Sequence, residues 1–122
     1  MIGYTTVGSN DLPKAKAFYS ELLGEMGCSA LMDLGRIVLF GKAQGQPMFA
    51  VCTPFDGQPA TVGNGNMVAL APGSRAAVDS LYAKAMSLGA ASEGEPGERM
   101  PGFYGGYVRD LEGNKLAFVH IG

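Results

Sequence analysis

The sequence predicts an α+β fold made of two β-α-β-β-β modules, and three features of the chain lead to it. The first is a repeat: segments 3–24 and 65–89 each begin with a short apolar run, pass through polar residues, continue with helical periodicity and end at a glycine. The second is spacing, because Tyr19 and Tyr82 occupy equivalent helical positions 63 residues apart. The third is that strand-like runs follow each helical pattern. One module alone would expose a face of its sheet, so we expect two to pack together.

The first module begins with residues 2–7, which are short and β-branched and therefore favour a strand. A helix should follow, because Asn10 or Asp11 can cap it and Pro13 falls in its first turn, where a missing N–H costs nothing. Its apolar stripe is Leu12, Ala15, Phe18, Tyr19 and Leu22. Gly24 suits a left-handed helix end. Three further strands are predicted in 28–35, 36–42 and 47–55.

The second module repeats this order. A strand is predicted in 66–72, and Ser74 can cap a helix that Gly89 ends. The inward stripe of that helix is Val78, Leu81, Tyr82, Ala85 and Leu88. Residues 92–102, rich in glycine and glutamate, are expected to form a long loop before strands at 103–110 and 115–121, which the turn 110–114 separates. A ferredoxin-like sandwich is the alternative fold, and the extra strand in each half argues against it.

Size and composition predict one domain, residues 1–122, with modules at about 1–58 and 64–122. Hydrophobic residues make up 47% of the chain and charged residues only 16%. So low a charged share suggests that a partner chain covers some apolar surface, and we expect a homodimer. The alternative is that the chain is simply rich in glycine and alanine.

The charge pattern argues against nucleic-acid and membrane partners. Net charge is −2, the lysines are scattered without a basic run, and no apolar run is long enough to span a bilayer. The amino terminus enters a strand at once, which leaves no room for a signal peptide. Cys28 and Cys52 are isolated, as reduced thiols of a cytoplasmic protein would be, although a disulfide between them stays open. We therefore expect a cytoplasmic protein.

Two segments carry a resemblance to a known family. "NDLPKAKAFYSELLG" at 10–24 and "GFYGGYVRDLEGNKLAF" at 102–118 resemble the vicinal oxygen chelate superfamily, which includes glyoxalase I, bleomycin resistance proteins and extradiol dioxygenases. The resemblance implies a curved, mostly antiparallel eight-stranded sheet with helices on its convex side and a pocket on its concave side. It also implies dimers as the usual assembly.

The same resemblance exposes a gap in the chemistry. Metal-dependent members place His, Glu or Gln ligands in the first and the last strand of each half. Here those places fall on Tyr4, Ala50, Asn66 and Ala117, and a slip of one residue brings no better donor. The fold is therefore expected without the metal centre, and without a cofactor.

No other catalytic set stands out. His120 is the only histidine and is more typical of a structural residue than of a base, so no Ser/His/Asp or Cys/His set can be built without it. The carboxylates of Glu93, Glu95 and Glu98 are expected to be solvated in the long loop. Arg109 should pair with Asp110 or Glu112 in the turn.

Strand alternation suggests which residues would line a pocket. Tyr4 and Asn66 would point into it if they take the old metal positions, and four aromatic residues could form its walls: Phe40, Phe49, Tyr104 and Tyr107. Ordinary core packing is the alternative for each aromatic. Such a cavity suits a modest, mostly apolar ligand held by few hydrogen bonds.

Three functions remain open at this point. The leading hypothesis is a metal-free small-molecule-binding member, because drug-sequestering resistance proteins use this scaffold without chemistry. The alternative is a glyoxalase-like lyase or a dioxygenase, which would need Glu93, Glu95, Glu98 or His120 to reach inward. The third is a structural or regulatory partner protein with a vestigial pocket.

Overall fold

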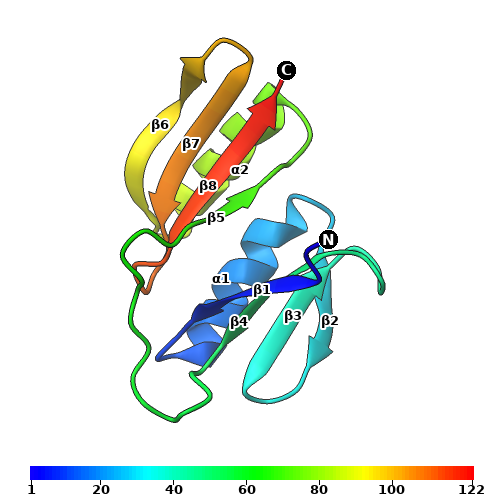
Figure 1. Cartoon of the computed structure of the whole chain (residues 1–122), viewed down its shortest axis with the longest axis vertical. Coiled ribbons are helices and arrows are strands. Elements are labelled where there is room, and N and C mark those ends of the chain that lie inside the picture. The colour runs from blue at the N-terminus through cyan, green and yellow to red at the C-terminus, as the bar shows by residue number, and fades with distance from the viewer. The chain divides into compact units, whose positions relative to one another are not determined.

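The protein is α+β, and its computed structural model describes all 122 residues as two compact units, Met1–Thr61 and Val62–Gly122 (Figure 1). The first unit contains β1 (Tyr4–Gly8), α1 (Leu12–Gly24), β2 (Ser29–Asp33), β3 (Ile37–Gly41) and β4 (Met48–Cys52). The second contains β5 (Val68–Leu70), α2 (Arg75–Ser87), β6 (Ala91–Met100), β7 (Phe103–Arg109) and β8 (Lys115–Ile121). The predicted repetition of β-α-β-β-β is confirmed, although β6 comes from residues that were predicted to be a loop.

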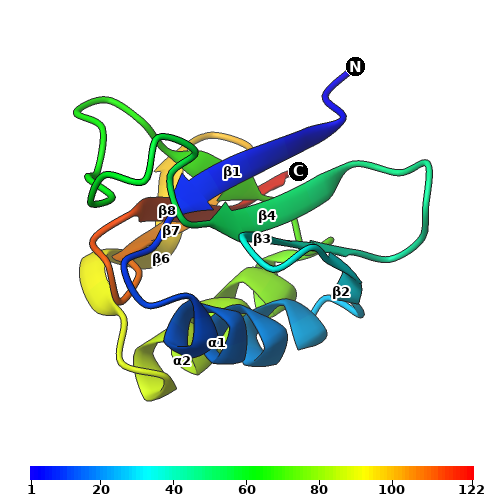
Figure 2. The same cartoon turned by 90° about the horizontal axis from the view of Figure 1, so that it is seen from below.

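Each unit has its own four-stranded sheet with the same strand order. The orders are β1-β4-β3-β2 and β5-β8-β7-β6, with one parallel pair and two antiparallel pairs in each. The first strand of each unit runs parallel to the last because the helix between them carries the chain back across the sheet. Figure 2 shows α1 on one side of strands β1, β4 and β3. Each sheet therefore has a helix-covered face and a helix-free face.

Local sequence explains where both helices begin. The Asp11 carboxylate accepts a hydrogen bond from the Lys14 amide at 3.2 Å, and the Ser74 hydroxyl accepts one from the Ala77 amide at 3.0 Å. Each bond satisfies an amide that has no partner within the helix. Both predicted caps are confirmed.

The helix ends agree with the prediction only in part. Gly89 has φ +100° and ends α2 as expected. The end of α1 differs: Gly24 stays within the helix, and the left-handed residue is Gly27, with φ +76°. The extra turn allows the Cys28 amide to bond back to the Leu23 carbonyl at 3.0 Å. Two glycines three residues apart offer two possible stops, and this hydrogen bond selects the second.

Strand β6 corrects the largest error of the sequence-based prediction. Residues 92–102 were expected to be a loop, but 91–100 pair with β7 as an edge strand. The ladder is interrupted by register shifts at three places, and Gly94 and Gly97 lie beside two of them. An edge strand tolerates Pro96, which has no N–H to donate, and bulges absorb the glycines. The glycines and the proline of this segment suggested a loop, because the same residues also make the strand irregular.

The core of each unit lies between its sheet and its helix. α1 buries Ala15, Phe18, Tyr19, Leu22 and Leu23, and α2 buries Val78, Leu81 and Ala85. These positions repeat the predicted stripes, with Leu23 added and with Leu12, Tyr82 and Leu88 only half-buried. Burial of about 25 cal/mol per Å² of apolar surface makes these contacts the main stabilising force of each unit.

The two cysteines are free thiols rather than a disulfide. Partial burial raises the pKa of the Cys28 thiol, and the positive charge of Lys42 opposes this in part. A raised thiol pKa lowers the thiolate fraction at neutral pH, so Cys28 is not an activated nucleophile.

Candidate functional site

The helix-free faces of the two sheets are where the structure leaves functional side chains accessible. In the first unit, Tyr4 and Thr6 lie on this face, since Thr5 and Val7 alternate toward α1. The register pairs Tyr4 with Met48 and Thr6 with Ala50, so these side chains share the face. Tyr4 is 54% exposed, and its phenol is free to meet a ligand.

The equivalent face of the second unit is set by the β5–β8 ladder. Ala69 pairs with Ala117 as Thr6 pairs with Ala50, so the residue equivalent to Tyr4 is Met67, two positions before Ala69. The sequence predicts Asn66 at the position equivalent to Tyr4. Its amide instead bonds the Gly63 carbonyl at 3.3 Å, and its side chain packs against Gly63 in the turn before β5. The short β5 makes the register ambiguous from the sequence alone.

The residues at the four ladder positions do not fit the metal centre that the resemblance implies. They are a phenol, a thioether and two methyl groups, from Tyr4, Met67, Ala50 and Ala117. A divalent cation in such a site needs imidazole or carboxylate donors, and none of the four side chains is one. No group of three or more His, Cys, Asp or Glu side chains is placed to hold a metal ion. No catalytic step through a metal follows from these residues.

Two of the four predicted aromatic wall residues belong to the core instead. Phe40 and Phe49 pair across β3 and β4 on the α1 side of the sheet and are 1% and 5% exposed. The Phe49 ring lies 4.7 Å from the ring of Tyr19 on α1, centroid to centroid. Their ring faces are used in packing, so the alternative of ordinary core packing holds for both.

Tyr104 also lies on the helix side of its sheet. Its hydroxyl donates a 2.5 Å hydrogen bond to the Asp79 carboxylate on α2, and the Arg75 guanidinium lies 5.1 Å from its ring centre. The bond to Asp79 raises the pKa of the Tyr104 phenol. Tyr104 thus ties β7 to α2 and does not reach the helix-free face.

Tyr107 is the predicted aromatic that does reach the helix-free face of the second sheet. It pairs with Ala117 across β7 and β8, and its hydroxyl extends along the strand over Gly105. Two cations flank the ring: the Arg99 guanidinium at 5.4 Å and the Lys115 ammonium at 5.6 Å from the ring centre. Sequence analysis missed both cations. Alternation could have indicated Lys115, which is two residues before Ala117 on the same strand.

Two of the three carboxylates of β6, those of Glu93 and Glu98, are paired with arginines. Glu93 accepts a 2.6 Å bond from Arg109, and Glu98 accepts a 2.6 Å bond from Arg75. The bond and the charge of Arg109 hold the pKa of the Glu93 carboxyl below its usual range. Arg109 therefore pairs with Glu93 across the β6–β7 ladder, rather than with the predicted Asp110 or Glu112. The turn 110–114 is as predicted, but Asp110 is used there to accept hydrogen bonds from the Glu112 and Asn114 amides.

His120 lies opposite Tyr104 in the β7–β8 ladder, which places it on the helix side with Tyr104. It is not among the residues of the helix-free face, which alternate with it along β8.

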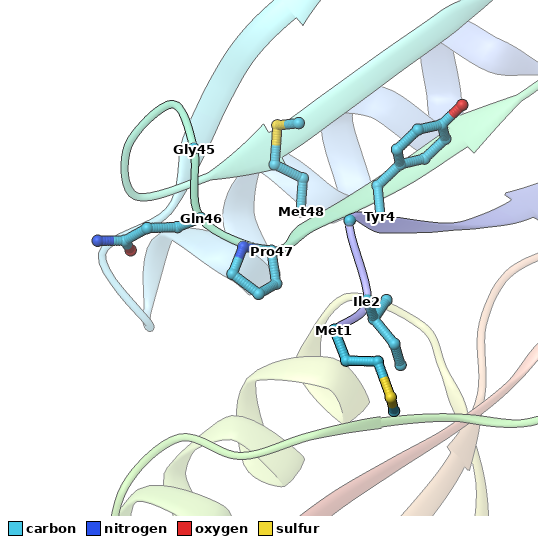
Figure 3. A pocket seen from close by; sticks show the side chains of 8 residues that line it. Met1, Ile2, Tyr4, Gly45, Gln46, Pro47 and Met48 are labelled. Carbon is cyan, nitrogen blue, oxygen red and sulfur yellow. The ribbon is translucent and has the colours of Figure 1, made fainter.

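A groove of about 300 Å³ adjoins Tyr4 in the first unit (Figure 3). Its walls come from the first residues of β1 and β4 and from the segments before these two strands: Met1, Ile2, Gly3, Tyr4, Gly45, Gln46, Pro47 and Met48. Figure 3 shows the Tyr4 ring and the Met48 side chain on the same side of the strands, as their register requires. The lining is mostly apolar, with the Tyr4 hydroxyl and the Gln46 amide as polar side-chain groups.

Comparison with known proteins gives a result only among solved structures. No protein-family model matches the chain, and no curated protein matches it. A glyoxalase/bleomycin resistance protein from Albidiferax ferrireducens is 33% identical, with a TM-score of 0.91, over 100% of this chain and 99% of that one.

Two more distant structures share the fold. A lactoylglutathione lyase from Agrobacterium tumefaciens is 24% identical with a TM-score of 0.72, covering 98% of this chain and 92% of that one. A glyoxalase/bleomycin resistance protein/dioxygenase family enzyme from Burkholderia phytofirmans is 15% identical with a TM-score of 0.76, covering 98% and 97%. The identity to the Albidiferax protein over the whole of both chains shows that this chain belongs to the glyoxalase/bleomycin resistance protein family.

Proposed function

We propose that the chain binds a modest, mostly apolar small molecule on the helix-free faces of its sheets, without a metal. The observation that carries this proposal is the identity of the four ladder residues, Tyr4, Met67, Ala50 and Ala117. At these positions the chain has small or apolar side chains and one phenol, where metal-dependent members of the family would need donor groups. The name of the Albidiferax relative, a glyoxalase/bleomycin resistance protein, admits a function in resistance as well as catalysis.

The groove beside Tyr4 supports the binding proposal. Its volume of about 300 Å³ is at the lower end of what small-molecule sites occupy. Met48 and Pro47 offer apolar contact, and the exposed Tyr4 phenol can donate one hydrogen bond. On the second sheet, the half-buried Tyr107 adds aromatic surface. Few polar groups amid apolar walls favour a ligand of the same character.

No observation favours the catalytic alternative. It needed carboxylates from β6 or the imidazole of His120 as ligands. Glu93 and Glu98 are engaged by arginines, and His120 is on the helix side of the sheet. Glu95 belongs to no group of three or more side chains that could hold a metal ion.

The proposal can be tested by metal analysis and ligand screening on the purified protein. We expect metal content far below one equivalent, both as isolated and after incubation with Ni²⁺, Zn²⁺, Mn²⁺ or Fe²⁺ followed by desalting. We also expect neutral aromatic and heterocyclic compounds to raise the melting temperature, and Tyr4→Ala to weaken their binding. Tyr82→Phe, on α2, is a matched control that removes one hydroxyl away from this face. Stoichiometric, tightly bound metal would defeat the proposal, as would lactoylglutathione formation that depends on added metal.

We further propose that the chain is a soluble cytoplasmic homodimer. The low charged share supports this, together with exposed apolar side chains such as Phe55 at 89% and Leu34 at 66%. No helix has the length and apolarity to cross a membrane. Light scattering after size exclusion should give a mass near twice 12.7 kDa, and a monomer at micromolar concentration would contradict the dimer.

A further inference from the structure

The helix-free face of the second sheet carries two cations around one aromatic ring. Arg99 on β6 and Lys115 on β8 both lie within 6 Å of the Tyr107 ring centre, at 5.4 and 5.6 Å. Each gains a cation–π attraction from the ring.

Backbone and glycines hold the Arg99 guanidinium in place. It donates a 2.5 Å hydrogen bond to the Glu95 carbonyl and lies across Gly94 and Gly97, where any larger side chain would meet its nitrogens at 3.2 and 3.0 Å. One of its five N–H groups is used in this bond, so others stay available for a ligand. The guanidinium is thus positioned before any ligand arrives, which lowers the entropy cost of binding.

The charges on this face do not cancel. The Glu93 carboxylate pairs with Arg109 at 2.6 Å and also interacts with the charge of Lys115, whereas Glu98 points to Arg75 on the other face. Neither Arg99 nor Lys115 has a carboxylate partner in an ion pair. Among Arg99, Lys115, Arg109 and Glu93, positive charges therefore outnumber negative ones, in a chain whose overall charge is −2.

We propose that this cluster of Arg99, Tyr107 and Lys115 binds the carboxylate of a small organic acid, whose flat apolar part packs against the edge of the Tyr107 ring. The inference rests on the proposed ligand-binding function and adds that the ligand is negatively charged. A carboxylate matches the planar fork of a guanidinium and also attracts the Lys115 ammonium.

Benzoate is the probe for the test, with benzamide as its neutral isostere and acetate as the carboxylate without a ring. Each is titrated into the ¹⁵N-labelled protein and followed by amide chemical shifts. We expect benzoate to shift amides of Gly105, Tyr107 and Ala117, and to bind more tightly than benzamide or acetate. Arg99→Gln and Lys115→Gln should each weaken benzoate binding about five- to tenfold. Lys14→Gln, which removes one exposed positive charge from α1, should leave it unchanged.

A test on the unaltered protein does not depend on whether a variant folds. If charge attracts benzoate, raising the salt concentration must weaken its binding. Equal affinity for benzoate and benzamide would overturn the inference, as would amide shifts confined to other strands. If neutral compounds bind in a Tyr4-dependent way while benzoate does not, the anion inference fails and the proposed function stands. If no compound of either kind binds, both fail.

Discussion

Substitution of Phe49 tests whether this side chain belongs to the core or is accessible to a ligand. Its side chain is 5% exposed and packs against the Tyr19 ring at 4.7 Å between centroids. Truncation to alanine removes the apolar burial of the ring and leaves a cavity under α1, and such changes cost about 3–5 kcal/mol. An aromatic pair adds about 0.5–1.5 kcal/mol beyond burial, so we expect the upper half of that range.

Urea denaturation followed by circular dichroism measures this loss for Phe49→Ala. For a chain of 122 residues, a loss of 3–5 kcal/mol should also lower the melting temperature by roughly 10–20 °C. Because that loss approaches the whole stability of many domains, Phe49→Leu serves as a milder second variant with a smaller decrease of the same sign. Tyr4→Ala is the matched control, since an aromatic side chain that is 54% exposed should cost well under half as much.

The reasoning would be refuted by a loss below about 1 kcal/mol for Phe49→Ala, which would place the ring outside the packed core. It would equally be refuted if Phe49→Leu left stability unchanged but altered the binding of a neutral ligand. That outcome would return Phe49 to the role of a pocket wall.

Three other predictions concern the second unit. Asp110 accepts three hydrogen bonds in its turn, two from amides and one from the Asn114 side chain, so Asp110→Ala should cost about 1.5–3 kcal/mol in urea denaturation and Asp110→Asn less. A loss under 0.5 kcal/mol would show that water replaces these bonds. A Cβ at Gly106 would meet the rigid Pro96 ring at 3.1 Å, whereas one at Gly105 has only 3.5 Å contacts. Gly106→Ala should therefore lose about 1–3 kcal/mol by the same assay while Gly105→Ala stays near the parent, and equal losses would contradict this packing. The Glu93 carboxyl, titrated by ¹³C NMR, should show a pKa below its ordinary 4.5, and Arg109→Gln should raise it. A lowered pKa stabilises the fold above pH 4.5 and this contribution disappears as pH falls through the folded value, so an unchanged pKa in Arg109→Gln would argue against the pair.

Local features of the fold were readable from the sequence because their causes are local. Asp11 and Ser74 cap their helices through amides three residues away, so a short stretch of sequence contains both partners of the bond. The apolar stripes predicted which face of each helix packs on its sheet, because they too depend on residues close together in the sequence. The stop at Gly27 rather than Gly24 depends on a backbone bond to Leu23, which the residue types alone do not reveal.

The candidate site was predictable only in part. The lack of metal donors followed from residue identity, and the register moved one position from Asn66 to Met67 without changing that conclusion. Tyr104 and Tyr107 are three residues apart on one strand, so alternation alone places them on opposite sides of the sheet. Alternation does not say which of the two residues lies on the side of α2. The answer came from the bond between Tyr104 and Asp79.

By itself, then, the sequence determined the α+β class, the repetition of the module, the helix caps and the absence of a ligand set at the ladder positions. Tertiary structure decided that residues 91–100 are a strand, that Phe40 and Phe49 are core, and that Arg99 and Lys115 meet at Tyr107. The physical reason is that caps and helical stripes depend on residues within one or two turns. The face of a strand residue depends instead on strands paired across the sheet and on the helix packed against them.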